Sequence, residues 1–313
     1  MALDRPEISG VLTQWTVQPL ALVVAVGLVA GYVYGLRRID HAWPAWRIAV
    51  FAVGIVMLVW TTCGFPQVYA HSLYWVWTGQ LLVVWLLAPI VILSGWPIQL
   101  AREVAGPHSR LDRVLQSAPV RVLANPLVGP GLVPVLSAVL FFGPVPTWSI
   151  TSTAFGWLLP VVMLAIGGAM VLPLVGMDER ASSLAVGLSL AIGSFELVLD
   201  ALPGIVLRLH NGLVTGWFDH RERHSWTPDA LRDQRVAGAI LWCLAELIDL
   251  PFIVIVFRRW VRADARDAAQ VDAVLDAERT ARRGLGGSAE TEAETEGDAP
   301  WWLTDPSMRN RLH

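Results

Sequence analysis

Four acidic residues lie within long apolar stretches of this chain, where an ionised side chain is costly. Glu196 and Asp200 are four residues apart, and Glu246 and Asp249 are three apart. On a helix either spacing places both side chains on one face. Carboxyl groups inside a membrane usually find partners, lose their charge or serve function, and Gln80 adds a polar group in another apolar stretch. The pattern predicts an intramembrane polar cluster that shares protons, holds a cation or only accepts hydrogen bonds.

Histidine and cysteine give weaker metal candidates. His220 and His224 have the four-residue spacing that places two imidazoles on one helix face. Arginines stand between them, so a solvated charged loop is the competing interpretation. Cys63 and His71 are eight residues apart and together suit Cu(I), which binds thiolate and imidazole, although a buried thiol explains the cysteine equally well.

Sequence motifs of the common enzyme classes are absent from this chain. It has no nucleophile elbow, glycine-rich phosphate loop or zinc-protease motif, so we do not expect an enzyme. All 23 basic side chains are arginines, and they are scattered rather than interleaved with aromatic residues. Nucleic acid is therefore an unlikely class of partner.

Seven apolar runs must position these residues. Hydrophobic residues make up 55% of the chain and the mean hydropathy is +0.53. Each run is near the ~20 residues that a helix needs to cross a bilayer, and none alternates as a barrel strand would. The sequence therefore predicts an all-α, polytopic membrane protein with a seven-helix bundle. The runs span residues 19–36, 48–65, 73–94, 127–145, 155–175, 183–207 and 236–257.

The arginines orient this bundle in the membrane. They concentrate in the connections after the first and third runs and directly after the seventh, whereas residues 64–71 and 146–153 contain none. Because basic loops stay in the cytoplasm, we expect an external N-terminus and a cytoplasmic C-terminus. The connection at 208–235 is external by parity despite its five arginines, which four acidic residues accompany.

The chain divides into four predicted segments. Residues 1–18 form an external N-terminal segment, 19–257 the seven-helix domain, 258–283 a cytoplasmic helical extension, and 284–313 a disordered acidic tail. The connection at 102–121 has apolar residues at helical spacing between charged ones. It suits a short helix lying on the surface of the lipid bilayer.

Two sequence blocks resemble a known family. One closes the third run and the other opens the seventh, and both keep their internal spacing. Together with the glycine-rich end of the fifth run, they resemble the CtaG-type cytochrome c oxidase assembly factors of bacteria. The residues that carry the resemblance are Ala88, Pro89, Gly95 and Pro97 in the first block and Asp233, Gln234, Gly238 and Trp242 in the second.

The resemblance implies a seven-helix assembly or accessory factor that supplies copper to the terminal oxidase or matures it. Its partners would be cytochrome c oxidase subunits or other respiratory membrane proteins. The family's histidine pairs, however, fall on Trp77 and Leu81 in the third run and on Gly156 and Pro160 in the fifth. Because none of these side chains ligates metal, we expect no copper at that place. Ion- or proton-coupled transport through the carboxyl cluster, and a structural role within a respiratory complex, are the alternative functions.

Overall fold

The computed structural model describes residues 4–7, 9–106, 109–123, 129–175 and 199–285. All regular secondary structure in these ranges is helical, which confirms the all-α class. The main helices are α2 (Pro19–Leu36), α3 (Ala45–Cys63), α5 (Tyr74–Leu82), α6 (Ala88–Ser94), α10 (Gly129–Phe142), α12 (Thr153–Val175) and α15 (Ala230–Leu285). Shorter ones are α1 (Gly10–Thr13), α4 (Phe65–Tyr69), α11 (Val145–Thr151) and α14 (Trp217–His220).

Four helical stretches are long and apolar enough to cross a membrane, namely residues 19–36, 45–69, 74–94 and 153–172. They match the first, second, third and fifth predicted runs. A fifth candidate is the pair Leu132–Phe142 and Val145–Thr151, which is bent by 52°. The sixth run lies largely outside the described residues, although 199–209 is helical, and the seventh lies within α15. The described residues therefore support a polytopic membrane protein with four or five spans, and the count of seven is not confirmed.

Two predicted connections have more structure than expected. Residues 146–153, predicted as a connection without basic residues, contain most of α11. Pro144 is the N-cap of this helix and Pro146 lies in its first turn, where proline is tolerated. The stretch at 102–121, predicted as one surface helix, forms three: α7 (Pro97–Ala105), α8 (Arg110–Leu115) and α9 (Ala118–Leu123). Gly106 ends α7 with a positive φ of 71°, and the Ser109 hydroxyl caps α8.

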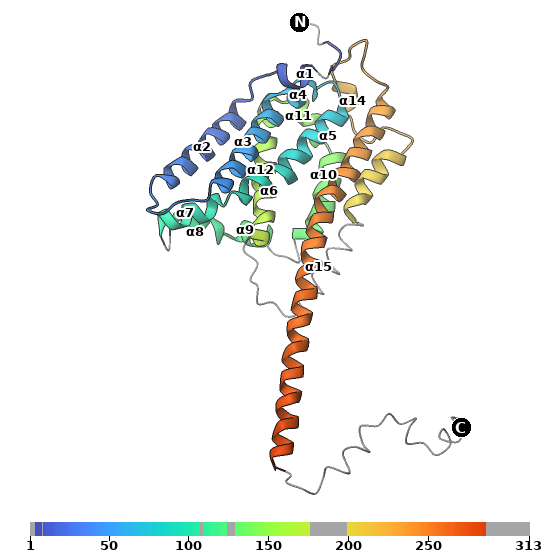
Figure 1. The fold of residues 1–313 in the computed structure, drawn as a ribbon. Helices are drawn as coiled ribbons and strands as arrows, with labels where there is room; N and C mark the ends of the chain where they lie inside the picture. The colour runs from blue at the N-terminus through green and yellow to red at the C-terminus, as the bar shows by residue number, and fades with distance from the viewer. Residues whose placement is uncertain (1–3, 8, 107–108, 124–128, 176–198, 286–313) are drawn as a thin grey trace, which may run out of the picture. The chain divides into compact units, whose positions relative to one another are not determined.

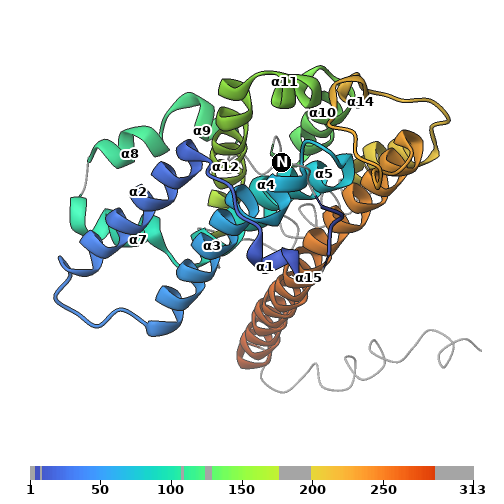
Figure 2. The same cartoon turned by 90° about the horizontal axis from the view of Figure 1, so that it is seen from above.

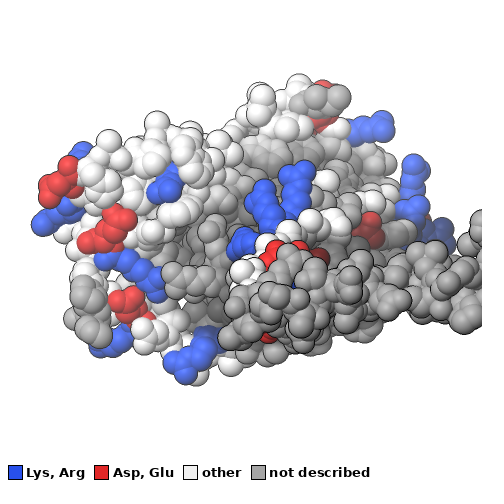
Figure 3. All heavy atoms as spheres, turned by 60° about the horizontal axis from the view of Figure 1, so that its bottom comes forward, with Lys and Arg blue, Asp and Glu red and all other residues white. Residues whose placement is uncertain are grey.

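Short helices lie at the two ends of the bundle (Figure 1). One end carries α1, α4, α11 and α14, and the other carries α7, α8 and α9. Figure 2 shows α2 lying beside both α3 and α7. Arginine and acidic side chains are mixed on the end that carries α7 and α8 (Figure 3). Helices α7, α8 and α9, from a connection predicted to face the cytoplasm, thus lie at the end opposite to α4 and α11, which lie in segments predicted to be external (Figure 1).

A π-helical segment, η1 (Val83–Leu87), joins α5 to α6 and lets α12 approach closely. Pro89 has no N–H to give to the carbonyl of Trp85, four residues earlier. That carbonyl faces Gly167 of α12 so closely that a Cβ atom at Gly167 has no room. The predicted Ala88-Pro89 block and the glycine of the fifth run therefore meet at one helix–helix contact.

From Arg258 onward α15 belongs to a second compact unit of the chain. Its described part is a continuous helix to Leu285, with exposed Val271, Val274 and Leu275. The acidic tail lies outside the described residues.

Candidate functional site

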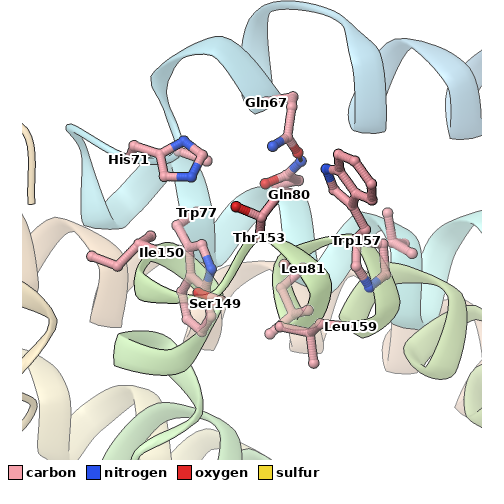
Figure 4. A pocket seen from close by; sticks show the side chains of 14 residues that line it. Gln67, His71, Trp77, Gln80, Leu81, Ser149, Ile150, Thr153, Trp157 and Leu159 are labelled. Carbon is pink, nitrogen blue, oxygen red and sulfur yellow. Dashed lines mark hydrogen bonds between the residues drawn. The ribbon is translucent and has the colours of Figure 1, made fainter. Parts of the chain in front are cut away.

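A cavity of about 220 Å³ lies between α5 and α12 at the end of the bundle that carries α4 and α11 (Figure 4). Its polar residues come from five places in the chain, and its apolar residues come mainly from α5, η1 and α12. The polar set is Gln67, His71, Gln80, Ser149 and Thr153, and the main apolar and aromatic set is Trp77, Leu81, Val84, Trp157, Leu159 and Pro160.

The polar side of this cavity is organised by two glutamines. The buried Gln80 donates from Nε2 to the Thr61 carbonyl at 3.0 Å and to Gln67 Oε1 at 2.5 Å. His71 stands beside them (Figure 4). Burial lowers the pKa of the His71 imidazole, against the opposing effect of the Glu222 carboxylate. The polar side therefore offers neutral hydrogen-bonding groups.

The apolar side contains the four positions at which the resemblance to the family implies histidines. Trp77, Leu81, Gly156 and Pro160 all line this one cavity. The Trp77 ring stacks on Tyr74 with centroids 5.4 Å apart, so the indole is part of the packed core. In the sequence these residues form one pair on each of two predicted helices, and the fold brings the two pairs together.

The predicted metal candidates do not gather into one site. Among the described residues, no group of three or more His, Cys, Asp or Glu side chains is placed to hold a metal ion. Cys63 is buried with the Thr62 hydroxyl 3.8 Å from its sulfur. His71 lines the cavity, and Cys63 is not among the lining residues.

The helical spacing predicted for His220 and His224 is wrong. Helix α14 ends at His220, and the next residue, Arg221, is extended with φ −65° and ψ 151°. The His220 Nδ1 atom lies 3.0 Å from the Gly216 carbonyl, while the His224 ring stacks on Trp226 at 5.0 Å. The two imidazoles therefore do not share a helix face, because Arg221 turns the chain to reach Asp233.

The intramembrane acids are described only in part. Glu196 lies outside the described residues, and Asp249 lies in α15 where side chains are not described. Asp200 is buried in the helical stretch 199–209. Glu246 accepts a hydrogen bond from Trp242 Nε1, one turn earlier on the same helix. The shared cluster with Gln80 stays a prediction.

Asp233 is a structural anchor between two distant segments. Its carboxylate accepts hydrogen bonds from the backbone N–H groups of Tyr74 and Trp75, each at 3.0 Å, at the start of α5. Arg221 Nη1 donates to the same carboxylate at 3.1 Å. Burial raises the pKa of Asp233, and these three donors oppose that shift. The carboxylate thus caps the helix that carries Trp77 and Gln80.

Gln234, the next residue, holds the connection that precedes α15. Its Oε1 accepts from the Val214 N–H at 3.0 Å, and its Nε2 donates to the Gly212 carbonyl at 2.9 Å. Four residues later, Gly238 packs against Gly204, whose carbonyl would lie 2.7 Å from a Cβ added at Gly238. The second sequence block therefore joins α15 to the stretch at 199–214.

The Gly95-Trp96-Pro97 turn of the first block is strained. Trp96 has φ 62°, the one positive φ among described residues other than glycine. The Arg47 guanidinium carbon lies 3.8 Å from the centroid of the Trp96 ring, and 5.1 and 5.4 Å from those of Trp43 and Trp46. These cation–π contacts help to offset the strain.

Several residues of the cavity were not predicted from the sequence, namely Gln67, Ser149, Thr153 and Trp157. Gln67 and Ser149 lie in the connections at 64–71 and 146–153, and Thr153 and Trp157 lie in the first turns of α12. Single polar or aromatic residues are common at these places, near the membrane surface. Only their convergence distinguishes them, and convergence has no signature in a single sequence.

Fold and site together define a polytopic helical membrane protein with a neutral cavity near one end of its bundle. The family model described as cytochrome c oxidase caa3 assembly factor (Caa3_CtaG) matches residues 30–263. The chain therefore belongs to this family, and the resemblance stated above is confirmed.

The chain is also similar to uncharacterized proteins of Mycobacterium bovis, Mycobacterium tuberculosis and Mycobacterium leprae. Each is 25% identical, over 293, 293 and 291 residues respectively, covering 87% of this chain and 43% of the relative. This chain thus spans less than half the length of these curated relatives. No solved structure matches it.

Proposed function

We propose that this protein is a membrane-embedded assembly or accessory factor for cytochrome c oxidase. The observation that carries the proposal is the match to the assembly-factor family across residues 30–263. The contacts of the family-motif residues support it, because they join α15 to the start of α5 and pack η1 and α6 on α12, and α5, η1 and α12 line the cavity. Such a role needs partner binding and no catalytic group, and oxidase subunits or other respiratory membrane proteins are the proposed partners.

The finer proposal is that oxidase maturation proceeds here without a histidine copper site in this cavity. The chemistry of the lining side chains supports this proposal. Trp77, Leu81, Gly156 and Pro160 supply no ligand atom, and His71 is the one imidazole in the lining. Copper prefers several imidazole or thiolate ligands. If copper delivery is part of the function, we propose that the copper binds to the partner or to another part of the chain.

The proposed membrane topology has an external N-terminus and a cytoplasmic C-terminus in a bacterial plasma membrane. The segments 64–71 and 146–153, which contain no arginine, lie at the end with α4 and α11. Helices α7 and α8, which carry Arg102, Arg110 and Arg113, lie at the other (Figure 1). Positive charge on the cytoplasmic side supports this orientation. The cavity would then open near the external surface.

The test is deletion of the gene in its own bacterium, followed by complementation. We expect the deletion to lower cytochrome c oxidase activity and the amount of assembled oxidase, and the wild-type gene to restore both. Co-purification in mild detergent should recover oxidase subunits with the protein. Metal analysis of the purified protein should show far less than one copper per chain. Unchanged oxidase in the deletion strain would contradict the assembly role, and stoichiometric copper beside Trp77 or Pro160 would contradict the finer proposal alone.

A further inference from the structure

The cavity between α5 and α12 is lined by uncharged groups. Its fourteen lining residues include no Asp, Glu, Lys, Arg or Cys, and one histidine. A metal cation needs several ligand atoms, and a buried anion needs a paired positive charge. The lining therefore favours an uncharged ligand.

Hydrogen-bond donors gather on one side of the cavity. Gln67 uses its Oε1 to accept from Gln80, which leaves its amide N–H groups available as donors. The His71 imidazole and the Thr153 hydroxyl stand near it (Figure 4). Neutral donors of this kind match ligand carbonyl oxygens.

Aliphatic groups form the opposite side, and two indoles flank the cavity. Leu81 and Leu159 lie across the cavity from His71 and Gln67 (Figure 4). Trp77 and Trp157 add flat indole surfaces, which favour stacking with another ring. The ligand should thus have a flat apolar body as well as acceptor atoms.

The depth and the volume of the cavity further restrict the kind of ligand that it can bind. Trp77 is three residues into the candidate span that begins at Tyr74, and Trp157 is four into the one that begins at Thr153. At ~1.5 Å per residue, both lie about 5 Å below the ends of the spans. A volume of about 220 Å³ is below the roughly 300 Å³ of the smallest drug-sized pockets. It accommodates a small ring system, and a longer tail must lie outside.

We propose that this cavity binds the head-group ring of a membrane quinone. Quinones are uncharged, planar and membrane-soluble, and they carry carbonyl acceptors on the ring. The ring carbonyls accept from the Gln67 and His71 side, the ring face lies on Trp77 and Trp157, and the prenyl tail leaves past the exposed Trp157 into lipid. The inference goes beyond the proposed assembly role and does not depend on it.

The experiment uses the full chain in lipid nanodiscs and a ubiquinone with one isoprene unit as the probe. Equilibrium binding is measured against empty nanodiscs, which report partition into lipid. The key variant is Trp157→Ala. Its matched control is Trp148→Ala, because the two indoles are 41% and 51% exposed and Trp148 does not line the cavity. Geraniol, which has a prenyl chain and no ring, serves as a competitor.

We expect saturable binding to the wild-type protein, at least tenfold weaker binding to Trp157→Ala, and a change of less than twofold in Trp148→Ala. A stacked ring is worth about a factor of ten. Geraniol should not compete. If Trp157→Ala does not fold, Thr153→Leu at the rim and Thr151→Leu outside the lining provide the same comparison. The proposal is overturned by binding no greater than that of empty nanodiscs, by equal losses in the two matched variants, or by effective competition from geraniol.

Discussion

The Asp233 carboxylate accepts a hydrogen bond of 3.0 Å from the backbone N–H of Tyr74, 159 residues earlier in the chain. This contact lies at the N-terminus of α5, where unpaired N–H groups and the helix dipole favour negative charge. Asp233 also neutralises Arg221, whose side chain is buried. One carboxylate thus fixes the start of α5, the connection after α14 and the first turn of α15.

We predict that Asp233→Ala strongly destabilises the protein. It leaves the Arg221 guanidinium buried without its carboxylate, a loss of about 3–5 kcal/mol in known buried pairs, and it uncaps α5. Asp229→Ala is the control, because the exposed Asp229 caps α15 through the N–H groups of Leu231 and Arg232. Its loss should cost about 1 kcal/mol. Unfolding of both variants in detergent would measure the difference, and equal losses would contradict the anchoring role.

Gly167 and Gly168 provide a second comparison, on one turn of α12. A Cβ at Gly167 collides with the Trp85 carbonyl and lies 2.9 Å from Pro89, whereas a Cβ at Gly168 has no atom within 4 Å. Gly167→Ala should therefore destabilise the bundle by about 1–3 kcal/mol. Gly168→Ala should be neutral or stabilise it by about 0.5–1 kcal/mol, since alanine favours helix. Thermal unfolding of the two variants checks the order, and the reverse order would show that α12 does not pack on η1.

His71 should make stability depend on pH. Burial lowers its pKa below the ordinary 6.5, with Glu222 opposing, so the folded state favours the neutral imidazole. The unfolded chain then binds a proton at a pH where the folded chain does not. This contribution to stability is present above about pH 6.5 and is lost as the pH falls through the folded pKa.

The substitution that tests it is His71→Asn, which is neutral throughout this range. We expect unfolding curves between about pH 7.5 and about pH 5.5 to show a smaller loss of stability on acidification in His71→Asn than in the wild type. Equal losses in both proteins would exclude His71 as the titrating group.

The proposed topology gives a further prediction. A reporter that is active only in the cytoplasm should give signal when fused after Arg262 and none when fused after Pro66. The arginines that open the tail and their absence from residues 64–71 are the reason. Signal from the Pro66 fusion and none from the Arg262 fusion would reverse the orientation.

Several elements of the structure could be predicted from the sequence because they depend on local composition. Helix α2 covers the first predicted run residue for residue, and the candidate span at 74–94 matches the third within one residue. In lipid a continuous apolar run must satisfy its own backbone hydrogen bonds, so a helix is the available form. The bend between α10 and α11 was not predicted, because hydropathy does not register where two prolines divide a run.

By itself, then, the sequence determined a helical membrane protein and its family blocks. Those properties depend on which residues occur and on their spacing along one helix. Only the tertiary structure decided that Trp77, Leu81, Gly156 and Pro160 line one cavity, and that Asp233 caps a helix 159 residues away. It also separated His220 from His224, because the buried Arg221–Asp233 pair holds the chain extended where the spacing favoured a helix. Contacts between distant segments depend on how helices pack, and packing is a property of the whole bundle.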